Sequence, residues 1–273
     1  MPTKSETYGK ATLRWQPVKD GGFEGAVIAH GKRGDVLRDE DEDRLVVRLR
    51  NEAGKLEPNY VGMDGAISRF LEFMPGGLRG ERNESEERDY KLAASQALNS
   101  VLPLEAALEA TEADAAELRK ARVWLNILSP YELMHMKTVL EKPEGPVFLR
   151  AAAKFASGHH AEGAQGMENA LKKYGSQSWP KATYFGYLWR PAGNMFCKPE
   201  VTKDFAQRIG HEFLHVYEPE ISERVYSSLM DLADHTLSAT RSLGAEDYID
   251  VQSFIYVVGG YKEQDRPITL LRD

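Results

Sequence analysis

The sequence has little cysteine and no long apolar run, and it lacks the common nucleotide-binding and nucleophile motifs. A single cysteine, Cys197, in 273 residues excludes an internal disulfide and is typical of a reducing compartment. No apolar run approaches the roughly 18 residues of a membrane span, and the N-terminus lacks the apolar centre of a signal peptide. We therefore expect a cytoplasmic protein with no membrane partner.

The sequence also lacks an excess of positive charge. It holds 35 Lys and Arg against 42 Asp and Glu, which gives a net charge of −7. This balance excludes a globally basic nucleic-acid binder but leaves a local basic patch open. Hydrophobic residues make up 42% of the chain, enough for a sizeable core without a structural metal.

The hydrophobic pattern predicts an α+β protein, with a small N-terminal β-barrel-like module over 11–62 and a mostly α-helical domain over 63–273. Residues 25–37, "GAVIAHGKRGDVL", are two apolar stretches around a Gly-bounded turn. "RLVVRLR" at 44–50 is rich in branched residues and indicates a further strand, preceded by a solvated acidic loop. Short strands with tight turns favour an SH3-like barrel, with an irregular β-ribbon as the alternative.

From Asp64 the pattern changes to helical spacing. We expect helices over 64–74, 87–102, 103–128 in one or two pieces, 129–142, 145–157, 160–174, 199–217 and 219–243. Ser129, Pro130 and Glu132 form the clearest helix start, a capping box with proline at the first position. Residues 244–261 are apolar, and periodicity leaves strand or helix open. In either case we expect a core of Ile249, Val251, Phe254, Ile255 and Val258.

One motif makes a specific chemical prediction. His211-Glu212-x-x-His215 matches the signature of zinc metallopeptidases, in which two histidines bind zinc and the glutamate is the general base. On a helix over 199–217, however, both histidines share the polar face, and no residue is marked by spacing as the third ligand. We interpret the motif as a solvated helix face with no metal or other cofactor. A zinc-dependent metallopeptidase or hydrolase is the alternative.

Residues 172–203 combine positive charge with aromatic rings. The stretch holds six basic residues against one acidic residue, Glu200, in an otherwise acidic protein. Cations interleaved with rings suit phosphates and bases, or an acidic protein partner, although the rings could equally be core. We expect a non-enzymatic binding or regulatory protein that contacts a nucleic acid or a protein partner here. The candidate binding residues are Arg190, Lys198, Lys181, Lys203, Trp189 and Tyr187.

Two regions resemble known families. Residues 29–56, through His30, the Gly31/Gly34 turn and the Val46-Val47 pair, resemble the SH3-like or Tudor-like barrels of CarD-type transcription factors and repair-helicase tails. That resemblance implies a module that contacts RNA polymerase. "RFLEFMPGGL", "ERDYKLAA", "LWRPAGNMFCKPEVT" and "YIDVQSFIYVVG", within 63–261, are similar to a family of uncharacterised bacterial proteins. This second resemblance implies no activity, and no zinc site, because that family lacks H-E-x-x-H at the corresponding place.

Overall fold

The computed structural model describes residues 2–175 and 177–267, and the chain divides into two compact units. The first, called the sheet unit, comprises residues 1–69 and 203–217. The second, called the helical unit, comprises residues 70–202 and 218–273. The boundaries fall inside two helices, α2 (Gly62–Phe73) and α11 (Pro199–Ile209). Each unit is described by itself.

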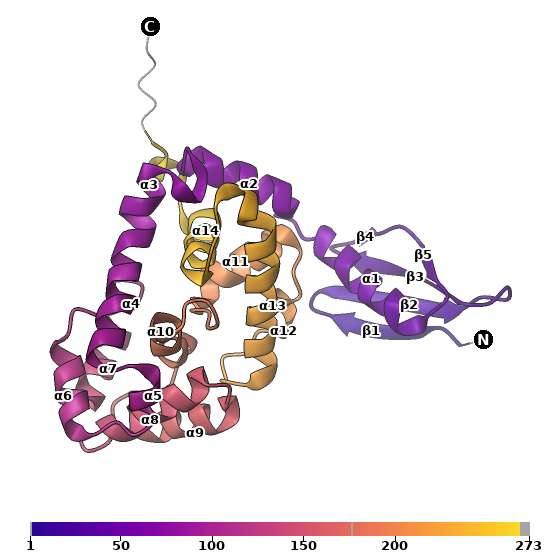
Figure 1. Ribbon diagram of the computed structural model, residues 1–273. Coiled ribbons are helices and arrows are strands. Elements are labelled where there is room, and N and C mark those ends of the chain that lie inside the picture. The colour runs from indigo at the N-terminus through magenta and orange to yellow at the C-terminus, as the bar shows by residue number, and fades with distance from the viewer. Residues whose placement is uncertain (1, 176, 268–273) are drawn as a thin grey trace, which may run out of the picture. The chain divides into compact units, whose positions relative to one another are not determined.

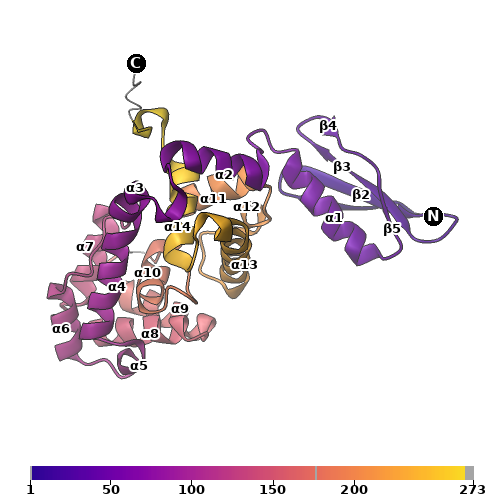
Figure 2. The ribbon, with the colours of Figure 1, turned by 45° about the horizontal axis from the view of Figure 1, so that its top comes forward.

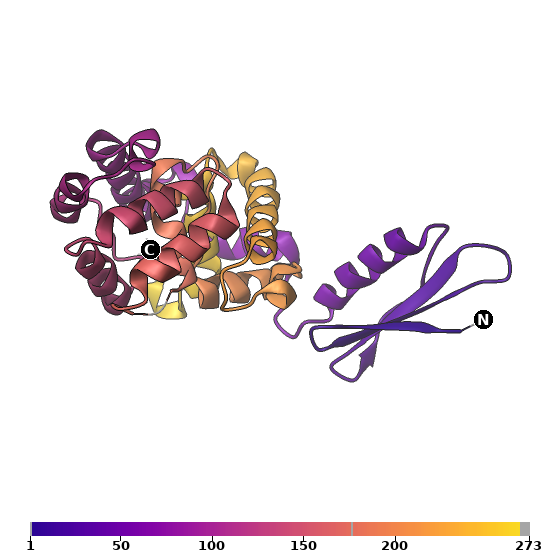
Figure 3. The ribbon, with the colours of Figure 1, turned by 90° about the horizontal axis from the view of Figure 1, so that it is seen from below.

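The sheet unit contains one antiparallel sheet of five strands. The strands are β1 (Lys4–Tyr8), β2 (Ala11–Pro17), β3 (Phe23–Ala29), β4 (Lys32–Arg33) and β5 (Leu37–Asp39). The order is β1-β2-β3-β4, and β5 also pairs with β3. Helix α1 (Glu42–Lys55) lies across one face of the sheet (Figure 3). Its Leu45 and Leu49 pack with Leu13, Trp15 and Val27 to form the core of this unit.

The sheet corrects the prediction of an SH3-like barrel, because it is open and has a helix on one face. Residues 44–50, expected as a strand, lie inside α1. The expected acidic loop contains the start of this helix, since the Asp41 side chain accepts the Arg44 N–H as the N-cap. Leu45 and Leu49 are one turn apart and fully buried, so the helical spacing of large apolar residues decides the structure.

The helical unit is built from short helices around a dense core. Its helices are α3 (Glu81–Asn83), α4 (Asp89–Val101), α5 (Leu104–Ala107), α6 (Glu112–Lys120), α7 (Pro130–Val139), α8 (Gly145–Ala156), α9 (His160–Leu171), α10 (Trp179–Trp189), α13 (Glu223–Thr240) and α14 (Tyr248–Gly260). The capping box of α7 is confirmed, with Ser129 as N-cap and Glu132 accepting the Ser129 N–H. The mostly helical character expected after residue 62 is confirmed as well.

Two helices form the centre of this unit. Figures 1 and 2 show α10 and α14 enclosed by the other helices, and every residue of α10 is buried. The segment whose structure periodicity left open is helix α14, and all five of its expected core residues are buried. Within the described residues, no helix has both the length and the apolarity to cross a lipid bilayer.

Two predicted helices are shorter than expected. Residues 103–128 form α5 and α6, but the chain is irregular from 121 to 128. The helix expected over 199–217 ends at Ile209, because Gly210 adopts a left-handed conformation with φ of 74°. A separate four-residue helix, α12 (Phe213–Val216), follows. The irregular segment contains Asn126, and the break after Ile209 places His211 and His215 outside α11.

Candidate functional site

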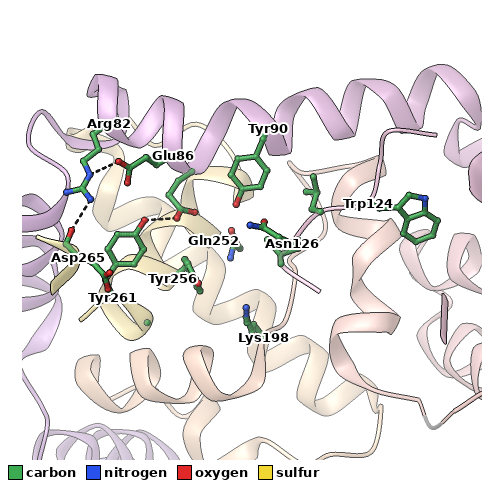
Figure 4. Close-up of a pocket in the computed structure, with 14 residues that line it drawn as sticks. Arg82, Glu86, Tyr90, Trp124, Asn126, Lys198, Gln252, Tyr256, Tyr261 and Asp265 are labelled. Carbon is green, nitrogen blue, oxygen red and sulfur yellow. Dashed lines mark hydrogen bonds and ion pairs between the residues drawn. The ribbon is translucent and has the colours of Figure 1, made fainter. Parts of the chain in front are cut away.

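The helical unit contains a polar pocket of about 640 Å³. Four parts of the chain line it: the start of α4 with the turn before it, the irregular segment 124–127, the residue before α11, and α14 with the turn after it. Figure 4 shows the side chains that point into this space. The central ones are Tyr90, Asn126, Lys198, Gln252, Tyr256 and Tyr261.

The wall at α4 begins with a π-helical turn, Glu84–Arg88. A π turn inserts an extra residue into a helix, and such turns are frequent at functional sites because they redirect side chains. Here Glu86 and Glu87 both line the pocket, while Arg88 is buried. Glu86 accepts a hydrogen bond from Arg82 Nε (2.9 Å), so its charge is paired at one end of the pocket.

Behind the pocket, Glu87 forms a buried ion pair with Lys91. Lys91 Nζ donates to Glu87 Oε2 (2.7 Å) and to Ser253 Oγ (3.0 Å), and its side chain is fully buried. Tyr261 donates its hydroxyl to the other oxygen of Glu87 (2.9 Å). Burial lowers the pKa of Lys91, and the adjacent Glu87 carboxylate opposes that shift. The pair therefore ties α4 to α14 and leaves Glu87 no uncompensated charge.

A second buried network fixes the start of α14. Asp250 is fully buried and accepts hydrogen bonds from Arg88 Nη1 (2.6 Å) and from Arg79, while its neighbour Asp247 caps the helix. Asp250 itself lies three residues after the cap position. Arg88 also donates to Asp247 (3.0 Å). These contacts hold the π turn and α14 together, and so set the distance between two walls of the pocket.

Helix α14 presents a polar stripe to the pocket. Gln252, Tyr256 and Gly260 follow one another at four-residue spacing, so they share one face of the helix. Gln252 is 4% exposed, and its Oε1 has no hydrogen-bond partner among the residues that the structure describes. A buried amide oxygen without a partner costs free energy, on the order of 1–3 kcal/mol, which a ligand N–H or O–H would recover. Asn126 lines the same pocket.

Lys198 brings a positive charge into the pocket. It is half-buried, and its Nζ lies 5.1 Å from the centroid of the Tyr256 ring. Among the described residues it makes no ion pair, whereas the nearby Glu86 and Glu87 are both paired. A cation over an aromatic face is stabilised modestly and keeps its capacity to bind an anion. This is the feature of the pocket that most clearly discriminates between ligands.

The pocket tyrosines stay neutral at physiological pH. Burial raises the pKa of Tyr90 well above its usual value, and the Glu87 carboxylate raises it further. Burial and Glu87 raise the pKa of Tyr256 as well. Neither hydroxyl has a hydrogen-bond partner among the residues that the structure describes. Both are therefore available to a ligand as donors or acceptors.

The structure separates the six residues predicted from the basic-aromatic stretch. Only Lys198 reaches the pocket. Tyr187 and Trp189 are buried in α10, and the Trp189 indole N–H donates to a backbone carbonyl. Lys181 is 2% exposed. The α10 members of the predicted set, Lys181, Tyr187 and Trp189, are therefore buried and do not form part of an exposed surface.

The other two candidate cations, Arg190 and Lys203, are not among the residues that line the pocket. Arg190 is exposed at the end of α10 and pairs with Glu105. Lys203 belongs to the sheet unit, with its Nζ 5.0 Å from the centroid of the Tyr217 ring.

The H-E-x-x-H residues lie in the sheet unit and do not share a helix. His211 follows the end of α11, and its Nδ1 accepts the Phe213 N–H (3.1 Å). His215, in α12, contacts the Tyr8 ring at a centroid distance of 4.5 Å. Gly9 permits this contact, since a Cβ there would lie 2.0 Å from the His215 ring. Glu212 is exposed.

A zinc ion would need three protein ligands in tetrahedral geometry. Within the described residues, no group of three His, Cys, Asp or Glu side chains is arranged to hold a metal ion. The local geometry therefore gives no support to zinc chemistry at His211 and His215.

Sequence reasoning missed most of the pocket. Tyr90, Asn126, Gln252 and Tyr256 come from elements far apart in the chain, and Asn126 falls in a segment expected to be helical. One signal was present: Gln252 and Tyr256 interrupt an apolar helix at four-residue spacing, which marks a polar stripe inside a buried element. Comparisons of the chain with protein-family models, with curated proteins and with solved structures find no match.

Proposed function

We propose that this is a binding protein whose ligand site is the pocket of the helical unit, and that the ligand is a small anionic molecule. The observation that carries the proposal is Lys198, a half-buried cation that faces the cavity and makes no ion pair among the described residues. A carboxylate or phosphate group on the ligand would complete that pair.

The polar groups around Lys198 indicate what else the ligand carries. Gln252 offers a buried amide oxygen without a partner, and Tyr90 and Tyr256 offer neutral hydroxyls. A ligand with hydroxyl or N–H groups next to its anion would satisfy them. The volume of about 640 Å³ lies within the usual 300–1,000 Å³ of small-molecule sites. Phosphorylated sugars, nucleoside monophosphates and hydroxy acids fit this description.

The negative charges of the pocket do not oppose this assignment. Glu86 is paired with Arg82, and Glu87 with Lys91. Asp265 lies at the Arg82 end of the pocket, apart from Lys198 (Figure 4), and its carboxylate accepts the Lys262 N–H (2.7 Å). The anionic group of a ligand at Lys198 therefore meets a local excess of positive charge.

The test is ligand-dependent stabilisation of the full chain. Thermal unfolding is measured with glucose 6-phosphate, AMP, citrate and inorganic phosphate, each alone. We expect at least one probe to raise Tm, because ligand at a hundredfold excess over Kd adds about 2.7 kcal/mol. Lys198→Met should abolish the rise. Arg190→Met, which removes an exposed cation from the same stretch, is the matched control and should retain it.

Gln252→Leu gives an independent measure. Replacing a buried amide that lacks one partner by an apolar side chain of similar size should leave Tm of the unliganded protein unchanged or higher, while ligand binding weakens. A probe whose stabilisation survives both Lys198→Met and Gln252→Leu binds elsewhere and would contradict the proposal.

A further inference from the structure

The sheet of the sheet unit has one covered face and one open face. Side chains alternate along each strand, so Leu13, Trp15 and Val27 point toward α1 and their neighbours point away from it. Figure 3 shows α1 on a single side of the sheet. Ile28 and Val36, on the other side, are 36% and 51% exposed. The open face is therefore a surface of this unit.

The strand register defines what the open face carries. Arg14 pairs with Ser5 and with Ala26, Thr12 with Thr7 and Ile28, and Ile28 with Arg33, so these side chains share one face. The polar side chains of the open face are Ser5, Thr7, Thr12, Arg14, Gln16, Glu24, Arg33 and Arg38. Among the strand residues that the structure describes, this face thus holds three arginines and three hydroxyl groups against a single carboxylate, and no aromatic ring.

Two of these arginines make no ion pair with any residue that the structure describes. Glu24, the carboxylate of this face, accepts Arg38 Nη2 (2.9 Å) and the Gln16 amide (3.2 Å). Arg14 and Arg33 are exposed, and neither makes an ion pair within the part of the chain that the structure describes. Both line the same shallow hollow of about 290 Å³, which also contains Gln16 and Ile28.

Three further carboxylates, Glu6, Asp39 and Glu42, lie on the α1 side, where each is paired with a cation. Lys4 pairs there with Glu42, and Arg50 pairs with Glu6. Asp39 likewise accepts ion pairs from Arg44 and Arg48, both on α1. Residues 1–62 are neutral as a whole, so this separation makes the open face the positive side of a unit without net charge.

We propose that the open face of the sheet binds duplex DNA through its phosphates. Arginine, hydroxyl and amide side chains are the groups that contact phosphate and sugar oxygens. Neighbouring strands lie about 4.8 Å apart, so three strands span roughly 10 Å, close to the roughly 12 Å width of the major groove. The absence of rings among the described residues of this face disfavours single strands, whose bases need aromatic platforms. This inference is independent of the pocket.

The test uses the full chain and a fluorescently labelled short DNA duplex at low salt, with binding followed by anisotropy. We expect wild-type binding that weakens steeply with salt. Arg14→Ala/Arg33→Ala should weaken it about tenfold or more at low salt and lower the salt slope by about two, because each arginine neutralises one phosphate. Both residues are exposed, and thermal melting checks that the variant folds.

The matched control is Arg44→Ala/Arg48→Ala, which removes the same charge from the α1 side of the same unit. It should leave binding within about twofold of wild type, since a surface cation beyond contact distance is screened. Glu24→Gln, which removes the carboxylate of the open face, should strengthen binding. Misfolding would lower the affinity for the duplex, so it cannot account for stronger binding.

Three results would overturn the proposal. One is the absence of binding to the duplex at low salt. Another is an equal loss of affinity in the control pair, which would make the effect one of net charge. The last is a preference of the wild type for single-stranded DNA of the same sequence, or for phosphatidylserine vesicles, over the duplex.

Discussion

The two units place their charged side chains differently. In the helical unit, Asp250 and Lys91 are fully buried and take part in networks that join the π turn to α14. In the sheet unit, the arginines that pair with carboxylates of the strands, Arg38, Arg44, Arg48 and Arg50, are 38–75% exposed. A buried pair must be satisfied inside the protein, so it fixes geometry, whereas a surface cation can exchange its partner for an external anion.

This difference matches the kind of ligand proposed for each unit. A pocket for a small molecule needs walls held at a constant separation, which the buried networks provide for Lys198 and Gln252. A face for a long polyanion needs exposed cations such as Arg14 and Arg33, with little preorganisation beyond a stiff sheet. This contrast would be wrong if the buried charges were dispensable for stability. It would be supported if the two units unfolded independently of each other.

The largest effect is expected from Asp250→Asn. Removing this charge leaves the largely buried Arg88 with one charged partner fewer, and breaking a buried pair costs about 3–5 kcal/mol. Glu24→Gln, the corresponding change on the open sheet face, should leave the unfolding free energy unchanged. Urea unfolding of both variants measures the contrast. An Asp250→Asn protein as stable as wild type would show that the network does not hold the pocket walls.

The sequence predicted elements whose determinants are local. The capping box of α7 needs only Ser129, Pro130 and Glu132, which lie within four residues, and the structure confirms it. Helix α1 was predicted as a strand because Val46 and Val47 favour extended backbone. Its buried stripe of Leu45 and Leu49 packs on a sheet formed by residues 4–39, and such tertiary packing overrides local propensity.

The candidate site was largely beyond sequence reasoning because its residues meet only in the folded chain. Lys198 was selected as a cation of the basic-aromatic stretch, and the structure places it in the pocket. Tyr187 and Trp189 were selected with it, yet both are core residues. The sequence alone does not show whether an aromatic side chain points into the core or toward solvent. Gln252 received no attention because a single amide in an apolar helix fits no motif.

The second-largest effect is expected from Leu49→Ala, which should destabilise the sheet unit alone. Leu49 is fully buried between α1 and the sheet, so Leu49→Ala should cost about 2–5 kcal/mol. Hydrogen exchange followed by mass spectrometry locates that cost. Amides of β2, β3 and α1 should exchange faster, while those of α14 should keep their wild-type rates, if the two compact units open independently. If the amides of α14 exchanged faster by the same factor, the two units would unfold as one cooperative body, which would contradict this expectation.

The smallest effect concerns one histidine in each unit. In the helical unit, the His160 ring lies 5.0 Å from Phe155 and 4.7 Å from Tyr226 between centroids, and its buried Nδ1 has no hydrogen-bond partner in the part of the chain that the structure describes. In the sheet unit, His215 packs on Tyr8. Burial lowers the pKa of both rings; Glu223 opposes the shift at His160, and Glu57 and Glu212 oppose it at His215.

The sign of the pH effect follows from where the proton binds. An unfolded histidine takes up a proton near its ordinary pKa of about 6.5, whereas these folded rings take it up only at lower pH. Acidification below about pH 6.5 therefore favours the unfolded state in both units, and the stability present above that pH is lost gradually. His160→Gln and His215→Gln should each reduce the loss of unfolding free energy between neutral pH and about pH 5.5. Hydrogen exchange assigns each change to its own unit, and a variant that loses as much stability as wild type would show that its ring is not a source of the acid sensitivity.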